Sequence, residues 1–309
     1  MKLNSDDEKE YYQSLPGIKT VKQLTEPTSI NLAKSIQRQA IATPLSTEAI
    51  ATTYVRQGSD GTPILLLHGF DSSVLEFRRL LPLLATENET WAVDLLGFGF
   101  TDRMTGISFS PNAIKTHLYY FWKKLIQKPV ILVGASMGGA AAIDFTLTYP
   151  DVVKKLVLID SAGVAAGSIM SKYMFPPLDY LATQFLRNPR IRASISRAAY
   201  KNKTLASVDA QLCAALHLQM PSWNQALIAF TKSGGYSSFK NKLTQIKQQT
   251  LILWGKEDRI LATTDAFRFK RAIAHSQLIW IKDCGHVPHL EQPQITAQHI
   301  LEFATTNPS

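Results

Sequence analysis

Short apolar runs alternate with longer segments of mixed polarity along most of the chain. Six of the runs have about four residues and almost no polar positions, which is typical of strands buried on both faces of a sheet. They lie at 64–67, 91–93, 130–133, 156–159, 251–254 and 278–281. Two more polar runs precede them, at about 37–43 and 50–56, and predict an antiparallel edge hairpin. The pattern as a whole predicts an α/β fold, with a mostly parallel central sheet flanked by helices.

Capping signals mark three of the intervening segments as helices. A serine followed three residues later by glutamate is a capping box and predicts a helix over 73–84. A Ser-Pro pair opens a second helix at 110–126, and a third, at 137–149, stops before a proline.

One interval is too long for a simple crossover. About 90 residues separate the strand that ends at Ile159 from the strand that begins at Leu251, whereas a crossover needs a dozen or more. We therefore expect a helical subdomain, a lid, inserted over 163–236 after the sixth strand. The predicted core is then 31–162 with 237–309, and residues 1–30 are a weakly ordered N-terminal extension.

Composition and charge narrow the class of protein. Hydrophobic residues make up 45% and charged residues 18% of the chain, a globular composition. Of the net charge of +9, the segment 161–240 contributes +7, from nine basic and two acidic residues. The favoured interpretation is a solvated basic face on the outside of the lid, where it can also attract an anionic membrane. No nucleic-acid motif accompanies the charge, so no nucleic-acid partner is expected.

The start of the chain mixes lysines with acids and has no apolar run. No secretory signal is visible there, and we expect a cytoplasmic protein.

The strongest chemical signal is Gly134-Ala135-Ser136-Met137-Gly138, which stands between a buried strand and a helix. This is the G-x-S-x-G nucleophile elbow in its required context. The sharp turn needs neighbours without a Cβ and lifts the serine hydroxyl above the sheet edge. We therefore predict that Ser136 is a nucleophile.

A serine needs a base and an acid that orients the base. Asp258 and His286 each follow a predicted strand, so both should lie at the same sheet edge as Ser136. The order Ser, Asp, His is that of this class of hydrolase. Glu257 or Asp160 could replace Asp258, and His289 could replace His286, as less favoured alternatives.

The loop His68-Gly69-Phe70 follows the strand at 64–67. Acyl transfer needs two donors for the oxyanion, and the backbone N–H groups of Phe70 and Met137 are predicted to supply them. His68 is expected to be a buried donor that shapes this loop. Cys284 is expected to be a buried filler outside the catalytic machinery.

These motifs together resemble the α/β-hydrolase superfamily. The resemblance rests on the His-Gly-Phe loop, on 94–99 (Asp-Leu-Leu-Gly-Phe-Gly), on the elbow, on 159–163 (Ile-Asp-Ser-Ala-Gly) and on the segments around Asp258 and His286; it spans about 40–305. More narrowly, the chain looks like the lidded branch of esterases, C–C bond hydrolases, epoxide hydrolases and dehalogenases. The resemblance implies a catalytic triad of Ser136, Asp258 and His286. A serine at the elbow argues against the last two activities, where the family carries aspartate.

We expect a serine hydrolase that cleaves a carboxylic ester of a small or lipid-like apolar substrate. The alternatives are cleavage of a C–C bond, an amide or a thioester on the same residues, or a ligand-binding receptor on the same fold. No metal or cofactor motif is visible. Phe98 and the lid residues Phe175 and Trp223 are predicted to line an apolar substrate pocket.

Overall fold

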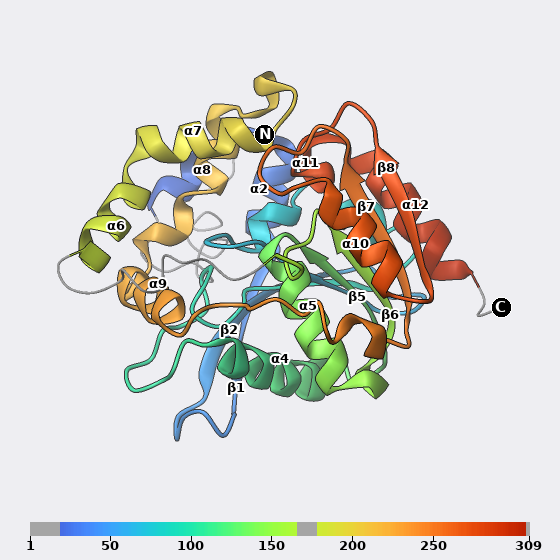
Figure 1. Ribbon diagram of the computed structural model, residues 1–309. Coiled ribbons are helices and arrows are strands. Elements are labelled where there is room, and N and C mark those ends of the chain that lie inside the picture. The colour runs from blue at the N-terminus through green and yellow to red at the C-terminus, as the bar shows by residue number, and fades with distance from the viewer. Residues whose placement is uncertain (1–18, 166–177, 307–309) are drawn as a thin grey trace.

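The eight strands that lie in the described part of the chain form one sheet. The computed structural model describes residues 19–165 and 178–306 (Figure 1). The strand order is β1-β2-β4-β3-β5-β6-β7-β8; β2 is antiparallel to both of its neighbours, β1 and β4, and the other neighbouring pairs are parallel. Their bounds are β1 (Ile36–Ile41), β2 (Ile50–Gln57), β3 (Ile64–Leu67), β4 (Thr90–Val93), β5 (Val130–Ala135), β6 (Val153–Ile159), β7 (Gln249–Gly255) and β8 (Ser276–Ile281). The predicted strands and the predicted edge hairpin are confirmed.

Side chains of the central strands alternate between two hydrophobic clusters, one on each face of the sheet. In β3, Leu65 and Leu67 belong to one cluster and Ile64 and Leu66 to the other. Helices α4 (Pro111–Leu125), α5 (Met137–Thr148) and α10 (Thr264–Ala272) cover the first face. The second face is covered by α2 (Pro27–Lys34), α3 (Leu81–Leu84) and α12 (Pro293–Thr305). Because both faces of the sheet are buried, its central strands are continuous apolar runs without alternating polar residues.

The predicted helix over 73–84 is broken into two short pieces. A 3₁₀ turn, η2 (Val74–Phe77), is followed by α3. The capping box does not form, because the Glu76 carboxylate accepts the Gly69 N–H, with oxygen–nitrogen distances of 3.0 and 3.2 Å. The other two predicted helices are confirmed as α4, which the Ser110 hydroxyl caps, and α5.

The long interval between β6 and β7 is helical where the structure describes it. It contains α6 (Leu178–Arg187), α7 (Pro189–Ala199), α8 (Val208–Cys213), the 3₁₀ turn η6 (Leu216–Gln219) and α9 (Trp223–Lys232). These elements lie together on one side of the sheet, at the upper left of Figure 1. The short helix α11 (Pro288–Glu291) precedes the carboxyl-terminal α12. The exact limits of the lid and of the core stay predictions.

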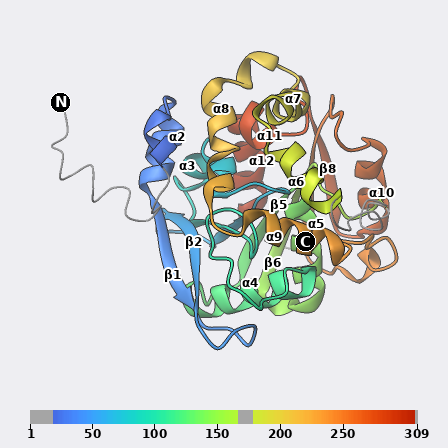
Figure 2. The same ribbon diagram turned by 90° about the vertical axis from the view of Figure 1, so that its left-hand side faces the viewer.

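Residues 19–30 are more ordered than the sequence suggested. A 3₁₀ turn, η1 (Lys19–Gln23), and the first half of α2 pack against the protein, and Val21 and Leu24 are buried. Asp209 of α8 accepts the Glu26 N–H at 2.9 Å, and its second oxygen accepts the Ser29 hydroxyl. Figure 2 shows α2 beside the β1–β2 edge. The expectation of weak order is therefore wrong for this segment, because buried apolar and carboxylate contacts hold it.

Candidate active site

Ser136 occupies the turn between β5 and α5. Its backbone has φ 52° and ψ −119°, a strained conformation for a residue with a side chain. The Ser136 N–H donates to Ile159 O at 3.0 Å, which fixes the turn against the end of β6. A Cβ on Gly134 would lie 2.3 Å from Gly138 O, and one on Gly138 would lie 2.1 Å from Leu67 O. The two glycines are thus required by the close approach of the backbone.

His286 and Asp258 complete a hydrogen-bonded chain with Ser136. The distance from His286 Nε2 to Ser136 Oγ is 3.0 Å, and the distance from His286 Nδ1 to Asp258 Oδ2 is 2.9 Å. Asp258 Oδ1 accepts the N–H groups of Ile260 and Leu261 at 2.7 and 3.1 Å. Burial raises the pKa of Asp258, but the His286 hydrogen bond and these amides outweigh burial, so the pKa lies below its usual value. Asp258 is therefore ionised at neutral pH, and a hydrogen bond from Nδ1–H leaves Nε2 free to accept the serine proton.

The alternative residues lie close by but hold other partners. Glu257 accepts the Cys284 N–H at 2.9 Å, and His289 Nε2 lies 3.2 Å from Glu76 Oε1. Asp160 is fully buried and accepts the Gly255 N–H at 3.0 Å. None of the three forms a hydrogen bond with Ser136 or His286 in the described part of the chain.

Asp160 and Asp258 form a buried pair of carboxyl groups. Burial and the neighbouring Asp258 charge raise the pKa of Asp160 well above its usual value. Two adjacent carboxylates cannot both ionise at low cost, so we expect the proton of this pair to reside on Asp160. Ligand atoms of Asp160, Asp258 and His286 lie within 4.8 Å of one another. Since Asp258 and His286 already share a hydrogen bond, we assign no metal to this group.

The Phe70 loop lies beside Ser136. His68 is fully buried; its Nδ1–H donates to Gly69 O at 2.8 Å, and its Nε2 accepts the Leu95 N–H at 3.1 Å. A Cβ on Gly69 would lie 3.4 Å from Ser136 Cβ, so the loop and the serine are in contact distance. Met137 is the first residue of α5, so its N–H has no acceptor in a preceding helical turn. The Phe70 loop and Met137 are thus neighbours of Ser136, and the oxyanion role of the Phe70 and Met137 amides stays a prediction.

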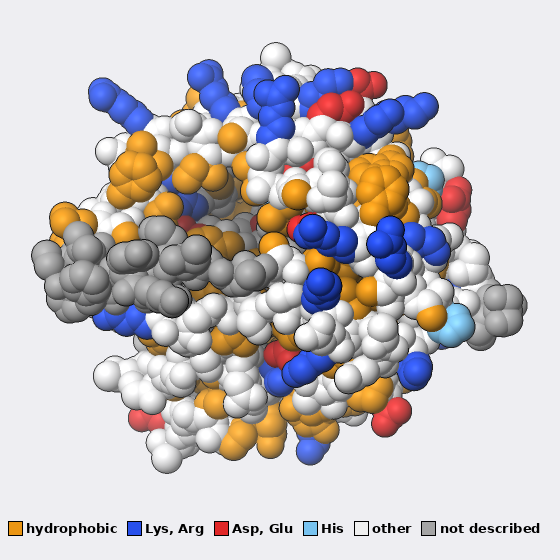
Figure 3. All heavy atoms as spheres, in the orientation of Figure 1, with side chains coloured by type: hydrophobic (Ala, Val, Ile, Leu, Met, Phe, Trp, Pro, Cys, Tyr) orange, Lys and Arg blue, Asp and Glu red, His pale blue; other side chains and the backbone are white. Residues whose placement is uncertain are grey.

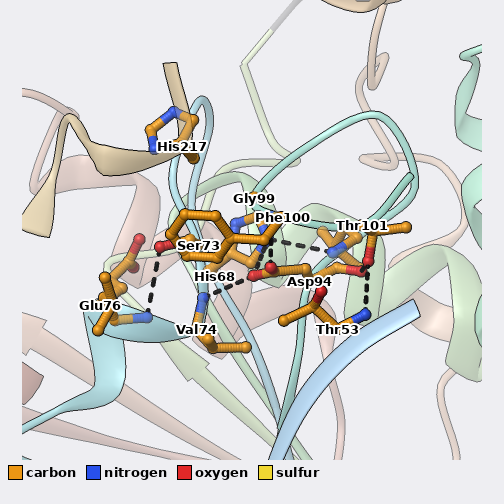
Figure 4. Close-up of polar contacts among 12 residues, drawn as sticks. Thr53, His68, Ser73, Val74, Glu76, Asp94, Gly99, Phe100, Thr101 and His217 are labelled. Carbon is orange, nitrogen blue, oxygen red and sulfur yellow. Dashed lines mark hydrogen bonds and ion pairs between the residues drawn. The ribbon is translucent and has the colours of Figure 1, made fainter. Parts of the chain in front are cut away.

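Asp94 fixes the base of this loop from the end of β4 (Figure 4). Its two carboxylate oxygens accept the N–H groups of Val74 at 2.7 Å and Phe100 at 2.6 Å. A Cβ on Gly99 would lie 2.1 Å from Asp94 Cγ, and Gly99 has φ 54°, so glycine is required there. The polar network holds β4 and η2 together beneath the Phe70 loop.

Asp71, which sequence reasoning missed, joins this loop to the lid. Its carboxylate accepts Arg192 Nη1 at 2.6 Å, His217 Nε2 at 3.0 Å and Trp223 Nε1 at 2.8 Å. Burial favours the neutral acid, but the hydrogen bonds from His217 and Arg192 and the charge of Arg192 outweigh burial and lower the pKa of Asp71. The φ of Asp71 is 48°, a further sign that the turn is held in a fixed conformation. An acidic residue directly after Phe70 was the only sequence signal.

Two cavities meet at Ser136. One has a volume of about 440 Å³ and is lined mainly by apolar residues, including Met137, Leu186, Leu227, Phe230 and Tyr236. The other, of about 320 Å³, contains His286 and combines apolar residues with polar ones such as Arg192. Phe70, Ser136 and Leu186 line both cavities. The site therefore has one apolar arm and one mixed arm.

The predicted pocket residues lie differently from what the sequence suggested. Phe98 is buried behind the cavities, with its ring 5.9 Å from that of Phe70 and 5.2 Å from that of Phe230. Trp223 is turned towards Asp71 and lines neither cavity. Its indole N–H needs a partner when it is buried, and Asp71 provides one. Phe175 lies outside the described residues.

Contacts with the lid backbone fix the position of the segment before His286. The His286 N–H donates to Ala199 O at 2.7 Å, and a Cβ on Gly285 would lie 2.3 Å from the same oxygen. Glu291 accepts the Gly285 N–H at 2.8 Å and the Lys201 N–H at 3.0 Å. The end of α7 and the histidine loop are thus tied together. Cys284 is fully buried, and burial raises the pKa of its thiol, as expected of a packing residue.

Serine, histidine and aspartate joined in this way at the carboxyl ends of parallel strands, below a helical insertion, define the class of α/β hydrolases. A family model described as the alpha/beta hydrolase fold matches residues 62–293. The alpha/beta hydrolase domain-containing protein VTE7 of Arabidopsis thaliana is 36% identical over 80% of this chain and 75% of its own. The chain therefore belongs to the alpha/beta hydrolase fold family and is a hydrolase.

More distant relatives differ in their described activities. A 2-hydroxy-6-oxo-2,4-heptadienoate hydrolase of Pseudomonas putida is 27% identical over 75% of this chain and 85% of its own. Lipase 1 of Psychrobacter immobilis is 26% identical over 79% of this chain and 77% of its own. Among the residues that the structure describes, no helix has the length and apolarity needed to cross a bilayer.

Proposed function

We propose that the protein is a serine hydrolase that cleaves a carboxylic ester of an apolar substrate through an acyl-enzyme. The observation that carries the proposal is the hydrogen-bonded chain Ser136–His286–Asp258, with distances of 3.0 and 2.9 Å, at the junction of two cavities. The apolar arm suits an acyl chain or a lipid-like alcohol, because small-molecule sites are mostly apolar with few polar groups. The similarity to a lipase supports the same bond type.

The steps follow from the geometry. Ser136 Oγ attacks the ester carbonyl carbon while its proton passes to His286 Nε2, and the negative oxygen that forms is bound by the Phe70 and Met137 amides. The C–O bond then breaks, and His286 gives the proton to the leaving alcohol oxygen. In the second half, His286 Nε2 accepts a proton from water as the water oxygen attacks the acyl carbon. The bond from the acyl carbon to Ser136 Oγ then breaks, and His286 returns the proton to Oγ, so that the acid and free Ser136 are released. Ionised Asp258 stabilises the imidazolium in both halves of the reaction.

A second candidate is hydrolysis of a C–C bond next to a ketone on the same three residues. It is favoured by the similarity to the 2-hydroxy-6-oxo-2,4-heptadienoate hydrolase. Against it, the loop after His68-Gly69 is short and has no glycine run.

Two assays separate the two candidate functions. One uses a series of p-nitrophenyl esters of increasing acyl length, and the other uses 2-hydroxy-6-oxo-2,4-heptadienoate, a vinylogous 1,5-diketone acid. We expect ester hydrolysis to rise with acyl length until the apolar arm is full. An added methylene that is buried gains about 0.8 kcal/mol, or a few-fold in kcat/KM. Rapid turnover of the diketone with slow ester hydrolysis would overturn the ester proposal. Absence of turnover on both would instead indicate a ligand-binding role.

A further inference from the structure

The outer faces of α6 and α7 combine exposed apolar side chains with exposed positive charge. On α6, Tyr180, Leu181 and Phe185 are 53%, 55% and 58% exposed. Exposed side chains of this size in one place mark an interaction site more often than chance, because large apolar patches are rare on monomeric proteins. Leu181 and Phe185 are four residues apart and therefore lie on one side of the helix.

Basic residues of α6, of α7 and of the segment that follows lie near these apolar side chains in the sequence. From residue 180 to residue 203 the chain carries six basic residues and no acidic one. Arg187, Arg190 and Arg197 are exposed, and in the part of the chain that the structure describes no ion pair includes them. The other three are engaged: Arg192 by Asp71, Lys201 by Asp283, and Lys203 by backbone carbonyls. Figure 3 shows Lys and Arg side chains along the top edge and hydrophobic side chains below them, over α6 and α7.

Helices α6 and α7 also contribute to the lining of the two cavities at Ser136. Ala182, Thr183 and Leu186 of α6 turn towards the cavities, on the opposite side of the helix from Leu181 and Phe185. Phe70 and Ile195 line the mixed arm and are still 45% and 49% exposed. These two residues mark the mouth of the cavity, and both are apolar.

We propose that the α6–α7 face, defined as Tyr180, Leu181 and Phe185 with Arg187, Arg190 and Arg197, docks on an anionic lipid bilayer. The arginines meet the headgroups, and the apolar side chains enter the boundary between headgroups and acyl chains. Docking brings the mouth at Phe70 and Ile195 to the lipid surface, so that an apolar substrate passes into the site without crossing water. The docking itself does not depend on the proposed hydrolysis.

The test is co-sedimentation with vesicles of phosphatidylglycerol and phosphatidylcholine, with pure phosphatidylcholine vesicles as the neutral comparison. We expect the full chain to bind the anionic vesicles and to be released by raised salt, which screens surface charge. Each arginine near an anionic surface changes partitioning roughly five-fold. The triple variant Arg187→Gln/Arg190→Gln/Arg197→Gln should therefore bind on the order of 100-fold more weakly.

The apolar side chains of the α6–α7 face are tested with a separate variant. Leu181→Ser/Phe185→Ser should weaken binding at least about ten-fold, because both side chains lose their transfer into the boundary region. As a matched control, Phe267→Ser removes a side chain that is 56% exposed on α10, and binding should not change. The charge control is Lys123→Gln/Lys124→Gln/Lys128→Gln, at exposed positions at and beyond the end of α4.

The proposal would be overturned by absence of binding by the full chain, by equal binding of the α6–α7 variants, or by equal losses in the control variants. A dimer in solution that Leu181→Ser/Phe185→Ser converts to monomer would also overturn it, because a second copy would then cover the face. None of the substituted residues lines either of the two cavities described at Ser136, so hydrolysis of a water-soluble short ester should be unchanged and reports that each variant is folded. Binding to vesicles should persist in Ser136→Ala. A failure of the proposed hydrolysis can therefore be distinguished from a failure of the proposed docking.

Discussion

Replacing Asp160 by asparagine should leave the reaction almost intact, although the residue is a buried carboxyl group next to the catalytic aspartate. Burial and the Asp258 charge raise the pKa of Asp160, so we expect this carboxyl group to act as a neutral donor. Asparagine keeps both contacts, since its oxygen can accept the Gly255 N–H and its NH₂ can donate to Asp258. We expect Asp160→Asn to retain kcat within about three-fold. Asp258→Asn should lose on the order of 10⁴-fold, as in the protease triad.

The same pair gives a stability prediction with a definite sign. The pKa of Asp160 is higher in the folded than in the unfolded chain, so the folded state holds a proton that the unfolded state releases above about pH 4. Its contribution is present at lower pH and is lost as pH rises towards the folded pKa. The free energy of unfolding of Asp160→Asn, relative to the natural chain, should therefore increase as pH rises from about 4 to 7.

Steady-state kinetics on a soluble ester and urea unfolding across this pH range check both points. Asp160→Ala serves as the control, because it leaves the buried Gly255 N–H without its partner, at a cost of about 1–3 kcal/mol. A loss of 100-fold or more in Asp160→Asn would refute the reasoning and show that Asp160 acts as an ionised group. A relative stability that falls with pH would refute the assignment of the proton.

Three further expectations concern the surroundings of the triad. Asp71→Ala removes the carboxylate that pairs with Arg192 and leaves His217 Nε2 and Trp223 Nε1 without this acceptor. Unfolding in urea should therefore show a loss of about 3 kcal/mol, and a change under 1 kcal/mol would contradict this expectation. Cys284→Ala should keep kcat within a few-fold, because the thiol is a packing group; a loss like that of a triad variant would contradict it. Phe230→Ala enlarges the apolar arm, so the preferred ester should lengthen in the p-nitrophenyl series, and an unchanged profile would place the acyl chain in the other arm.

Much of the fold could be predicted from sequence because the strands are buried on both faces. Runs such as Leu251–Trp254 carry no polar position, and their spacing sets the order of strands and helices. The three residues joined at the site were found for a related reason. The steric demands at Gly134 and Gly138 leave a mark in the sequence, and residues after parallel strands meet at one edge.

The partners that hold the site could not be predicted, because they come from contacts distant in sequence. Asp71 meets Arg192 across 121 residues and Trp223 across 152. Whether Trp223 turns to the pocket or to Asp71 depends on the lid packing, which no local pattern encodes. The same holds for Glu76, which the sequence predicts in a capping box but which accepts the Gly69 N–H in the structure. Burial raises the Glu76 pKa, but His289 and His68 outweigh burial and hold it at about 2.

The measurement that tests the central proposal most directly is labelling with a fluorophosphonate, followed by peptide mass spectrometry. We expect one added phosphonyl group, located on Ser136 in the natural chain and absent from Ser136→Ala. Labelling of Ser136 should be much slower in His286→Ala than in the natural chain, because Ser136 then lacks its base. Modification of another residue, or unchanged labelling of Ser136→Ala, would contradict the assignment of Ser136 as nucleophile.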